Sequence, residues 1–375
     1  MSAHAALGSA AVLRVGNERL PVLGRARLYV CGITPYETTH VGHAATFVWA
    51  DVAARILRLV GAAVDVCRNV TDVDDHLLVQ ATREGVSWRS LATQETYRFE
   101  RDMAALGVAR PSFEPRSHDY VDEVIALAQE LLENGTAYEH NGSVYFRGAD
   151  VITDVGISRE RAIELALEHG GHPDDPDKDD PLDAALWHRS SGDEPAWPSP
   201  WGPGRPGWHA ECSAMALATF GPTIDLHIGG ADLAFPHHAF EAAQAEAYTR
   251  VRPFARAWMH VGNVRVGGEK MAKSTGNLVY VRDVLDRYPA GALRLLIMSR
   301  PWDQAWDFDE ASLERAAVEL ETLWRYGASS GDRDTAEHEV ALALLDNLDV
   351  PMALEAAKGA GGQVLRDLVA LLGLN

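Results

Sequence analysis

The stretch 25–71 constrains the fold more than any other part of this 375-residue chain. It begins with a continuous apolar run, RARLYVCGI at 25–33, which is typical of a buried strand. The next segment, 40–61, carries apolar residues at helical spacing and ends at a glycine suited to a helix C-terminus. These apolar residues are Val41, Ala44, Val48, Val52, Ile56 and Val60. Because AAVDVCRNVT follows at once, the pattern predicts a strand–helix–strand unit of a parallel sheet.

The character of the chain changes between about 118 and 205. Two helical runs there lead into the acidic, proline-broken PDDPDKDDP at 173–181 and then into a stretch rich in Trp, Pro and Gly. We interpret this region as an insertion into the sheet. Short apolar segments return at 221–266, and a helix is predicted at 309–326, with more helix as far as Leu374. Its apolar face comprises Leu313, Ala316, Leu320 and Leu323.

Composition disfavours several classes of protein. The 34 basic and 54 acidic residues give a net charge of −20, which repels a polyanion on average, although a local basic patch could still hold one. The sequence contains no window of the roughly 18 uncharged apolar residues that a membrane helix needs and no basic, apolar leader. Cys31, Cys67 and Cys212 lie far apart, so metal binding or catalysis is favoured over a disulfide framework. We expect a globular, cytoplasmic protein.

The tetrapeptide HVGH at 40–43 lies where the first predicted strand turns into the helix. The imidazoles of His40 and His43 and the first free N–H groups of the helix then face a common point that suits an anion such as a phosphate. Helix-capping histidines beside a packing glycine are the alternative explanation of the same letters.

A second polar motif, KMAKS at 270–274, is followed by TGN and carries two ammonium groups three residues apart, on Lys270 and Lys273. Such groups can meet the β and γ phosphates of ATP. A solvated charged loop is the alternative, but the presence of the first motif favours an ATP site.

Four further residues have side chains of the kind that bind zinc. Cys31 ends the first strand, Cys212 lies in GWHAECSAM, and His237 and Glu241 are four residues apart, which places both on one helical face. Taken singly, each cysteine could also be a small buried apolar residue and His237 a structural histidine.

HVGH and KMAKS, in this order and separation, resemble the two signatures of class I aminoacyl-tRNA synthetases. Longer segments spanning about 25–310 resemble cysteinyl-tRNA synthetase and its relatives. They are YVCGITPY, RNVTDVDD, GRPGWHAECSAM, GGADLAFPHH and GGEKMAKSTGN. The resemblance implies an α/β fold of the class I aminoacyl-tRNA-synthetase type. It also implies a reaction in which an amino-acid carboxylate displaces pyrophosphate from ATP, bound with Mg²⁺.

The resemblance also implies one zinc ion per chain and L-cysteine as the substrate. In those enzymes zinc is held by the equivalents of Cys31, Cys212 and His237, with Glu241 in the tRNA synthetase, and takes the substrate thiolate as a further ligand. A hydroxyl is a poor substitute for sulfur on zinc, so serine would be rejected.

The same resemblance assigns roles around the nucleotide. His40, His43, Lys270 and Lys273 would stabilise the pentacoordinate phosphate, and Trp208 would close over the substrate side chain. Contacts with cysteine, ATP or the adenylate are implied for Gly32, Ile33, Thr34, Thr46, Asn69, Val70, Thr71, Gly230, Asp232 and Val264. From the residues alone, Trp208 could be core, and Asn69 and Asp232 could be turn residues.

Two relatives share this site and differ in the acceptor. In the tRNA synthetase a ribose hydroxyl forms an ester, whereas in the mycothiol-pathway ligase the amine of glucosaminyl-inositol forms an amide. GITPY at 32–36 with the second histidine of HVGH, the segment 168–187, and a chain that stops soon after LDNLDVPMAL favour the amine ligase. There is no room for an anticodon-binding domain after Asn375.

Other segments match the tRNA synthetase better, namely Glu241 with EAAQAEA, VRDVLDRYPAGALRLL and DFDEASLE. Ala272, Ala231 and Ala239 stand where Ser, Ser and Glu are usual in both relatives. On the features that favour the amine ligase, we predict a cysteine ligase that uses an amine acceptor, most simply glucosaminyl-inositol. The alternatives are a truncated synthetase that charges tRNA, a ligase for another amine, and a zinc-binding paralogue without activity, which the intact motifs disfavour.

The expected organisation is a Rossmann-like catalytic domain with an inserted domain and a short C-terminal helical bundle. Its catalytic domain would comprise 1–117 and 206–265, with an inserted connective domain at 118–205. A signature-loop region would follow at 266–308 and the bundle at 309–375, without an anticodon-binding domain.

Overall fold

A computed structural model describes residues 12–21, 24–36, 39–192, 194–271, 275–327 and 334–374. At its centre lies a four-stranded sheet in the order β10-β9-β3-β4, in which every neighbouring pair is parallel. The predicted strand–helix–strand unit is confirmed as β3 (Arg25–Ile33), α2 (Val41–Leu59) and β4 (Ala63–Val70). The strands β9 (Leu226–Gly230) and β10 (Trp258–Val261) complete the sheet.

Both faces of this sheet are covered, which explains the continuous apolar run of β3. Its side chains alternate between two cores, because successive residues of a strand point to opposite faces. Leu28 and Val30 pack in the core that contains α2, whereas Tyr29 and Cys31 pack in a second core with residues of α8 (Trp208–Phe220). The six apolar residues predicted on the face of α2 are all buried, and Gly61 follows the helix with φ 93°.

The region between β4 and α8 contains a second sheet that the sequence pattern did not predict. Its four strands run antiparallel in the order β5-β6-β7-β8. They are β5 (Ala137–His140), β6 (Ser143–Phe146), β7 (Ala184–Arg189) and β8 (Gly204–Pro206). The helices of this region are α5 (Val121–Glu133), α6 (Ala149–Val155) and α7 (Arg159–Glu168). Its core also includes Ala210, Ala214 and Phe240, so helices from beyond residue 206 cover this sheet.

The remaining elements connect and flank these two sheets. Before the insertion lie β1 (Val12–Val15), β2 (Glu18–Pro21), α3 (Asp75–Glu84), α4 (Trp88–Ala105) and η1 (Ser117–Asp119). After β9 come η2 (Ala231–Leu233), η3 (Ala234–His238), α9 (Ala239–Thr249), β11 (Val264–Val266), β12 (Glu269–Lys270) and β13 (Trp306–Asp307). The later helices are α10 (Val281–Leu285), α11 (Ala290–Met298), α12 (Glu310–Gly327), α13 (Asp334–Leu345), α14 (Val350–Ala360) and α15 (Gly362–Leu371).

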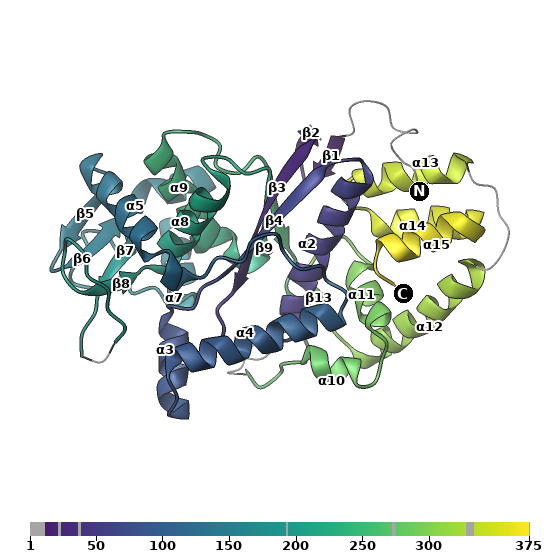
Figure 1. Cartoon of the computed structure of the whole chain (residues 1–375), viewed down its shortest axis with the longest axis horizontal. Coiled ribbons are helices and arrows are strands. Elements are labelled where there is room, and N and C mark those ends of the chain that lie inside the picture. Colours follow the sequence, from purple (N-terminus) through teal and green to yellow (C-terminus); the bar gives the residue numbers. More distant parts are fainter. Residues whose placement is uncertain are drawn as a thin grey trace.

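The parts of the molecule are arranged in a row around the parallel sheet. Figure 1 shows β3, β4 and β9 in the middle, the antiparallel sheet to the left, and α12 to α15 to the right. The predicted apolar face of α12 is buried, because Leu313, Ala316, Leu320 and Leu323 pack into the core shared with α2. Over the part of the chain that the structure describes, no helix has the length and apolar character needed to cross a membrane.

One buried ion pair ties the C-terminal helices to α2. Arg294 of α11 and Asp51 of α2 are 0% and 2% exposed, and their side chains approach to 2.8 Å. The same guanidinium donates to the carbonyl oxygens of Leu106 and Leu372. Its donors are thus shared among two carbonyl oxygens and the carboxylate of Asp51. Burial of two charges is costly unless both remain paired. Arg294 therefore depends on Asp51, whereas Asp51 is also contacted by the more exposed Arg55 at 2.7 Å.

Replacement of Arg294 by Met should therefore lower the free energy of unfolding by about 3 kcal/mol, because Asp51 loses a buried counter-charge. Urea denaturation followed by circular dichroism measures this change. Arg287→Met is the matched control, since its pair with Glu310 is 55% and 43% exposed and should contribute less than about 1 kcal/mol. Equal effects of the two substitutions would contradict the prediction.

Candidate active site

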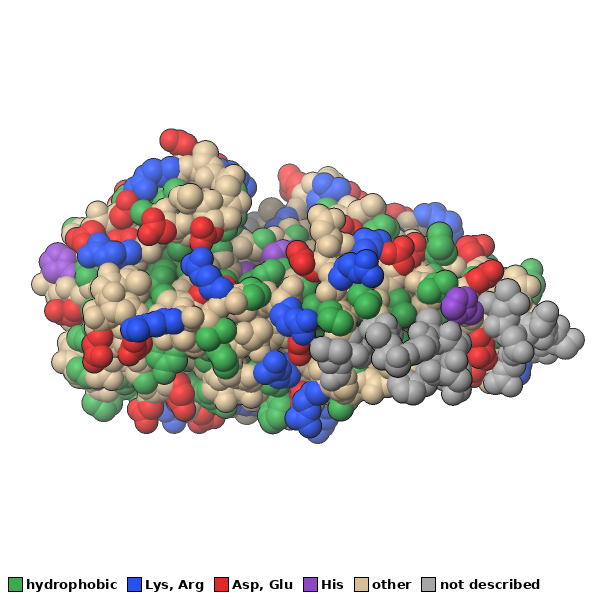
Figure 2. Space-filling view, turned by 90° about the horizontal axis from the view of Figure 1, so that it is seen from above, with side chains coloured by type: hydrophobic (Ala, Val, Ile, Leu, Met, Phe, Trp, Pro, Cys, Tyr) green, Lys and Arg blue, Asp and Glu red, His purple; other side chains and the backbone are tan. Residues whose placement is uncertain are grey.

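The carboxyl ends of β3, β4 and β9 open into one large cavity. Its volume is 1120 Å³, and its walls also include α2, α7, α8, β11 and the loop that leads into β7. Figure 2 shows the surface hollowed between the inserted region and the rest of the molecule. Ligands of open parallel sheets bind outside the carboxyl ends of the strands, which makes this cavity the candidate active site.

Most of the residues singled out from the sequence line this cavity. They are Cys31, Gly32, Ile33, Thr34, His40, His43, Thr46, Asn69, Thr71, Trp208, Cys212, Gly230, Asp232, His237, Val264 and Lys270. Val70 does not line it, because this residue faces the core beside α2 while its neighbour Asn69 faces the opposite side of the sheet. Glu241 is fully buried behind the cavity wall. Lys273 and Ala272 lie outside the described residues.

Cys31, Cys212, His237 and Glu241 form a compact group that we call the donor cluster. One sulfur, nitrogen or oxygen atom of each lies within 4.8 Å of the others, and all four residues are buried. The Nε2 atom of His237 lies 2.7 Å from Glu241 Oε1 and 3.3 Å from Cys212 Sγ. Cys31 Sγ lies 3.2 Å from the same oxygen of Glu241. All three cysteines of the chain are free thiols.

The electrostatics of the donor cluster follow from burial and mutual contact. Burial by itself would lower the pKa of His237, but the neighbouring Glu241 and Cys212 raise it to about 10. Burial would likewise raise the pKa of Glu241, whereas His237 and His227 hold it well below its usual range. Burial and a hydrogen bond with Cys212 raise the pKa of Cys31. In the absence of a cation, a protonated His237 thus balances the carboxylate of Glu241.

Three residues hold the donor cluster from outside. The second oxygen of Glu241 lies 2.6 Å from His227 Nε2, and the other nitrogen of His237 lies 2.8 Å from His209 Nδ1. The amide of Asn69 donates to Cys212 Sγ at 3.2 Å. Supporting contacts of this kind fix ligand orientation in metal sites. His209 and His227 were not identified as site residues from the sequence. The available signal was their position, because His209 follows Trp208 and His227 lies just before GGADLAFPHH.

HVGH forms the N-terminus of α2. His40 caps this helix, because its Nδ1 accepts a hydrogen bond from the backbone N–H of Gly42 at 3.1 Å. A Cβ atom at residue 42 would lie 2.8 Å from the His40 ring, so this contact requires glycine. The rings of His40 and His43 stack with centroids 3.8 Å apart. The capping explanation of the motif is confirmed. Because both rings also line the cavity, binding of a phosphate by this motif stays a prediction.

Both histidines of this motif are neutral at pH 7. Burial, together with the nearby His43 and Lys270, lowers the pKa of His40 to about 2. Burial also lowers the pKa of His43, to about 4, although Asp232 opposes this shift. Because Nδ1 of the neutral His40 ring accepts a hydrogen bond from Gly42, its proton resides on Nε2.

Lys270 at the end of β12 forms an ion pair with Asp232 of η2 across the nucleotide side of the cavity. Burial would raise the pKa of Asp232, but Lys270 keeps it below its usual value. Lys270 is the residue expected to contact phosphate, and Asp232 is the residue expected to contact the amino acid or adenylate. In this structure each of these two groups is the counter-ion of the other.

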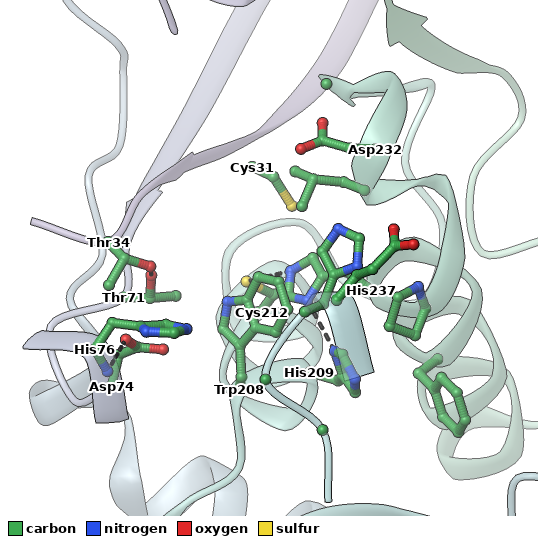
Figure 3. A pocket seen from close by; sticks show the side chains of 18 of the residues that line it. Cys31, Thr34, Thr71, Asp74, His76, Trp208, His209, Cys212, Asp232 and His237 are labelled. Carbon is green, nitrogen blue, oxygen red and sulfur yellow. Dashed lines mark hydrogen bonds between the residues drawn. The ribbon is translucent and has the colours of Figure 1, made fainter. Parts of the chain in front are cut away.

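Trp208 covers the donor cluster. Its ring stacks on His237 with centroids 4.1 Å apart and is also nearly parallel to the ring of His169, at a centroid distance of 6.5 Å. Figure 3 shows Trp208 beside Cys212 and His237, with Thr34, Thr71 and His76 across the cavity. The hydroxyl oxygens of Thr34 and Thr71 are 2.8 Å apart. Ala231 lines the same cavity, whereas Ala239 packs against the core of the inserted region.

Comparison with known proteins identifies the fold and the family. The family model described as "tRNA synthetases class I (C) catalytic domain" matches residues 21–318. Methionyl-tRNA synthetase of Mycobacterium tuberculosis bound by methionyl-adenylate is structurally similar, with a TM-score of 0.67 at 18% identity over 93% of this chain and 84% of that one. At this identity the similarity concerns the fold, and it confirms the predicted fold class.

Characterised relatives are similar over most of their own length. The L-cysteine:1D-myo-inositol 2-amino-2-deoxy-alpha-D-glucopyranoside ligase of Tsukamurella paurometabola is 45% identical over 88% of this chain and 82% of that protein. The ligase of the same name from Gordonia bronchialis is 42% identical over 93% of this chain and 90% of that protein. The chain therefore belongs to the class I tRNA synthetase catalytic-domain family and, within it, to the family of these cysteine ligases.

Proposed function

We propose that this protein activates L-cysteine with ATP and joins the cysteinyl group to the amine of glucosaminyl-inositol, as in mycothiol biosynthesis. AMP and pyrophosphate are the other products. The observation that carries this proposal is the 41% to 45% identity with ligases named for that reaction, over most of both chains. A donor cluster suited to a thiol substrate, located beside HVGH, supports it. A reducing cytoplasm would keep Cys31 and Cys212 as thiols.

The donor cluster fits a zinc ion. Two thiols, an imidazole and a carboxylate are the side chains that zinc prefers, and all four are buried with their donor atoms within 4.8 Å of one another. We assign Cys31, Cys212, His237 and Glu241 as its ligands. When bound, the zinc ion supplies a soft Lewis acid that favours the thiol of cysteine over the hydroxyl of serine.

The roles proposed for the surrounding residues in activation are those that the resemblance implies, and their charge and their position in the cavity agree with these roles. A cysteine whose thiol lies at the donor cluster would be covered by Trp208, and its ammonium group would be balanced by Asp232. Its carboxylate attacks the α-phosphorus of ATP, which enters with Mg²⁺, and the bond to pyrophosphate breaks. His40 and His43 donate hydrogen bonds to the phosphates, while Lys270 and Lys273 neutralise the developing charge. Binding of both substrates therefore separates Lys270 from Asp232.

Transfer follows from the chemistry of the adenylate. The acceptor nitrogen attacks the carbonyl carbon, the bond from that carbon to the phosphate oxygen breaks, and AMP leaves with the electron pair. The nitrogen then loses a proton to solvent. A tRNA ribose hydroxyl could attack in the same way, and the match to a tRNA synthetase domain model is the observation that favours it. The net charge of −20 opposes a polyanionic acceptor.

Replacement of Cys212 by Ser should reduce the zinc content of purified protein from one ion per chain to a small fraction, because a thiolate ligand is lost. Elemental analysis measures the metal, and cysteine-dependent pyrophosphate exchange should fall in parallel. Cys67→Ala is the matched control, since Cys67 is also buried and free but lies outside the donor cluster. Full zinc content in the Cys212 variant would remove the metal assignment.

Replacement of Lys270 by Ala should lower the rate of pyrophosphate exchange about 100-fold, because a cation that neutralises phosphate charge is lost. The KM for cysteine should change little, since Asp232 becomes available to the substrate ammonium. Lys358→Ala serves as the control, because Lys358 pairs with Glu319 and Glu355 on the C-terminal helices. Wild-type exchange rates in the Lys270 variant would show that this residue does not act on phosphate.

Release of AMP from ATP and cysteine should be stimulated by glucosaminyl-inositol, and mass spectrometry should detect the cysteinyl amide. Cysteine tRNA should give no ester under the same conditions. Formation of cysteinyl-tRNA alone would replace the proposed acceptor with tRNA. Activation without transfer to either acceptor would point to a different amine.

A further inference from the structure

The cavity extends beyond the residues assigned to cysteine and ATP. The remaining part, which we call the acceptor lobe, is lined by five polar residues. They are Asp75 and His76 of α3, Lys178 of the loop before β7, His188 of β7 and Arg205 of β8. Figure 3 shows His76 and its neighbour Asp74 on the wall opposite Trp208. The acceptor lobe and the donor cluster therefore belong to one continuous cavity.

The walls of the acceptor lobe are held in place by a largely buried cation. Arg205 is 8% exposed and forms an ion pair with Asp75, which fixes the first turn of α3 against β8. His188 is the direct cross-strand partner of Arg205. Because side chains alternate along β7, Trp187 points into the core of the inserted region while His188 points into the cavity. Elements distant in sequence thus form one prearranged wall.

Two side chains of this wall, those of His188 and Lys178, have no hydrogen-bond or ion-pair partner among the residues that the structure describes. No hydrogen bond joins the His188 ring to another described residue, although the ring is half-buried. Burial and the nearby Arg205 lower the pKa of His188 to about 4, so at pH 7 one ring nitrogen donates and the other accepts. Lys178 is also half-buried, and within the described ranges no carboxylate oxygen lies within 4.0 Å of its ammonium nitrogen. Half-buried polar groups of this kind gain from a hydrogen-bonding ligand.

The mixture of groups indicates the chemical class of that ligand. Lys178 offers donors, Asp75 offers acceptors, and neutral His188 offers one of each. Hydroxyl groups also donate and accept, so a polyhydroxylated ring matches this set. A phosphate-bearing acceptor would instead meet the carboxylates of Asp74, Asp75 and Asp175, which line the same region. The charges therefore favour a neutral or cationic polyol over a polyanion.

We propose that the acceptor lobe binds the hydroxyl-bearing rings of the acceptor and directs its amine toward the cysteinyl-adenylate, with His188 and Lys178 as the residues that determine acceptor specificity. This assignment rests on the proposed function. Both residues act on the second substrate, so they contribute to transfer and leave cysteine activation unchanged.

The experiment compares His188→Ala, Lys178→Met and the double variant with His338→Ala, a control at an exposed histidine of α13. Two rates are measured for each protein, namely cysteine-dependent pyrophosphate exchange and amide formation with glucosaminyl-inositol. Loss of one hydrogen-bonding group should raise the KM for the acceptor about tenfold in each single variant and more in the double variant. Pyrophosphate exchange should stay within about twofold of wild type, which also reports correct folding.

Glucosamine, which lacks the inositol ring, provides a second comparison. If the acceptor lobe holds the rings, the unaltered protein should prefer glucosaminyl-inositol, and this preference should shrink in the double variant. His188→Gln should restore part of the affinity, since an amide also donates and accepts.

The outcomes separate this assignment from the proposed function. An unchanged acceptor KM in the double variant would overturn the acceptor lobe alone, as would a parallel fall of exchange and ligation. Absence of amide formation by the unaltered protein would overturn the proposed function and this assignment together.

Discussion

The close approach of β3 and β4 at Gly32 is the contact on which the candidate site depends. A Cβ atom on Gly32 would lie 1.7 Å from the carbonyl oxygen of Asn69, so only glycine permits this approach. The backbone N–H of Gly32 then donates to the Asn69 side chain at 2.9 Å, and the amide of Asn69 donates to Cys212. One glycine thereby links the edge of the parallel sheet, the adjacent strand and a thiol of the donor cluster. The position of Cys31, the preceding residue of β3, depends on the same contact.

Electrostatic balance in the cavity is achieved mainly by burial of histidines in different charge states. His40 and His43 are neutral because burial disfavours their cationic forms, whereas His237 is held as a cation by Glu241. The wall formed by HVGH thus presents neutral rings near Lys270, and the donor cluster presents a carboxylate balanced by a cationic imidazole. These two histidine environments within one cavity match the two substrates of the proposed function, a phosphate and a thiol-bearing amino acid.

The sequence predicted those parts of the fold that depend on long periodic patterns. The strand–helix–strand unit and the buried face of α12 were evident because apolar residues recur over many turns. The antiparallel sheet was missed, because β5, β6 and β8 have only three or four residues and β6 is buried at every position. The four residues of the donor cluster could be named from their motifs. The contacts of His227 and His209 could not be predicted, because the sequence does not indicate which carboxylate or imidazole a given histidine contacts in the folded chain.

The acceptor lobe illustrates the same limit, since its wall joins α3, a loop and two strands that are far apart in the chain. The stack of His169, Trp208 and His237 joins these regions in another way. His169 follows α7 in the inserted region, whereas His237 belongs to the donor cluster. Any rotation of Trp208 that covers a cysteine side chain must change its packing on His169. The indole ring of Trp208 therefore connects the inserted region with the donor cluster, so the proposed closure over cysteine would also alter the wall on the His169 side.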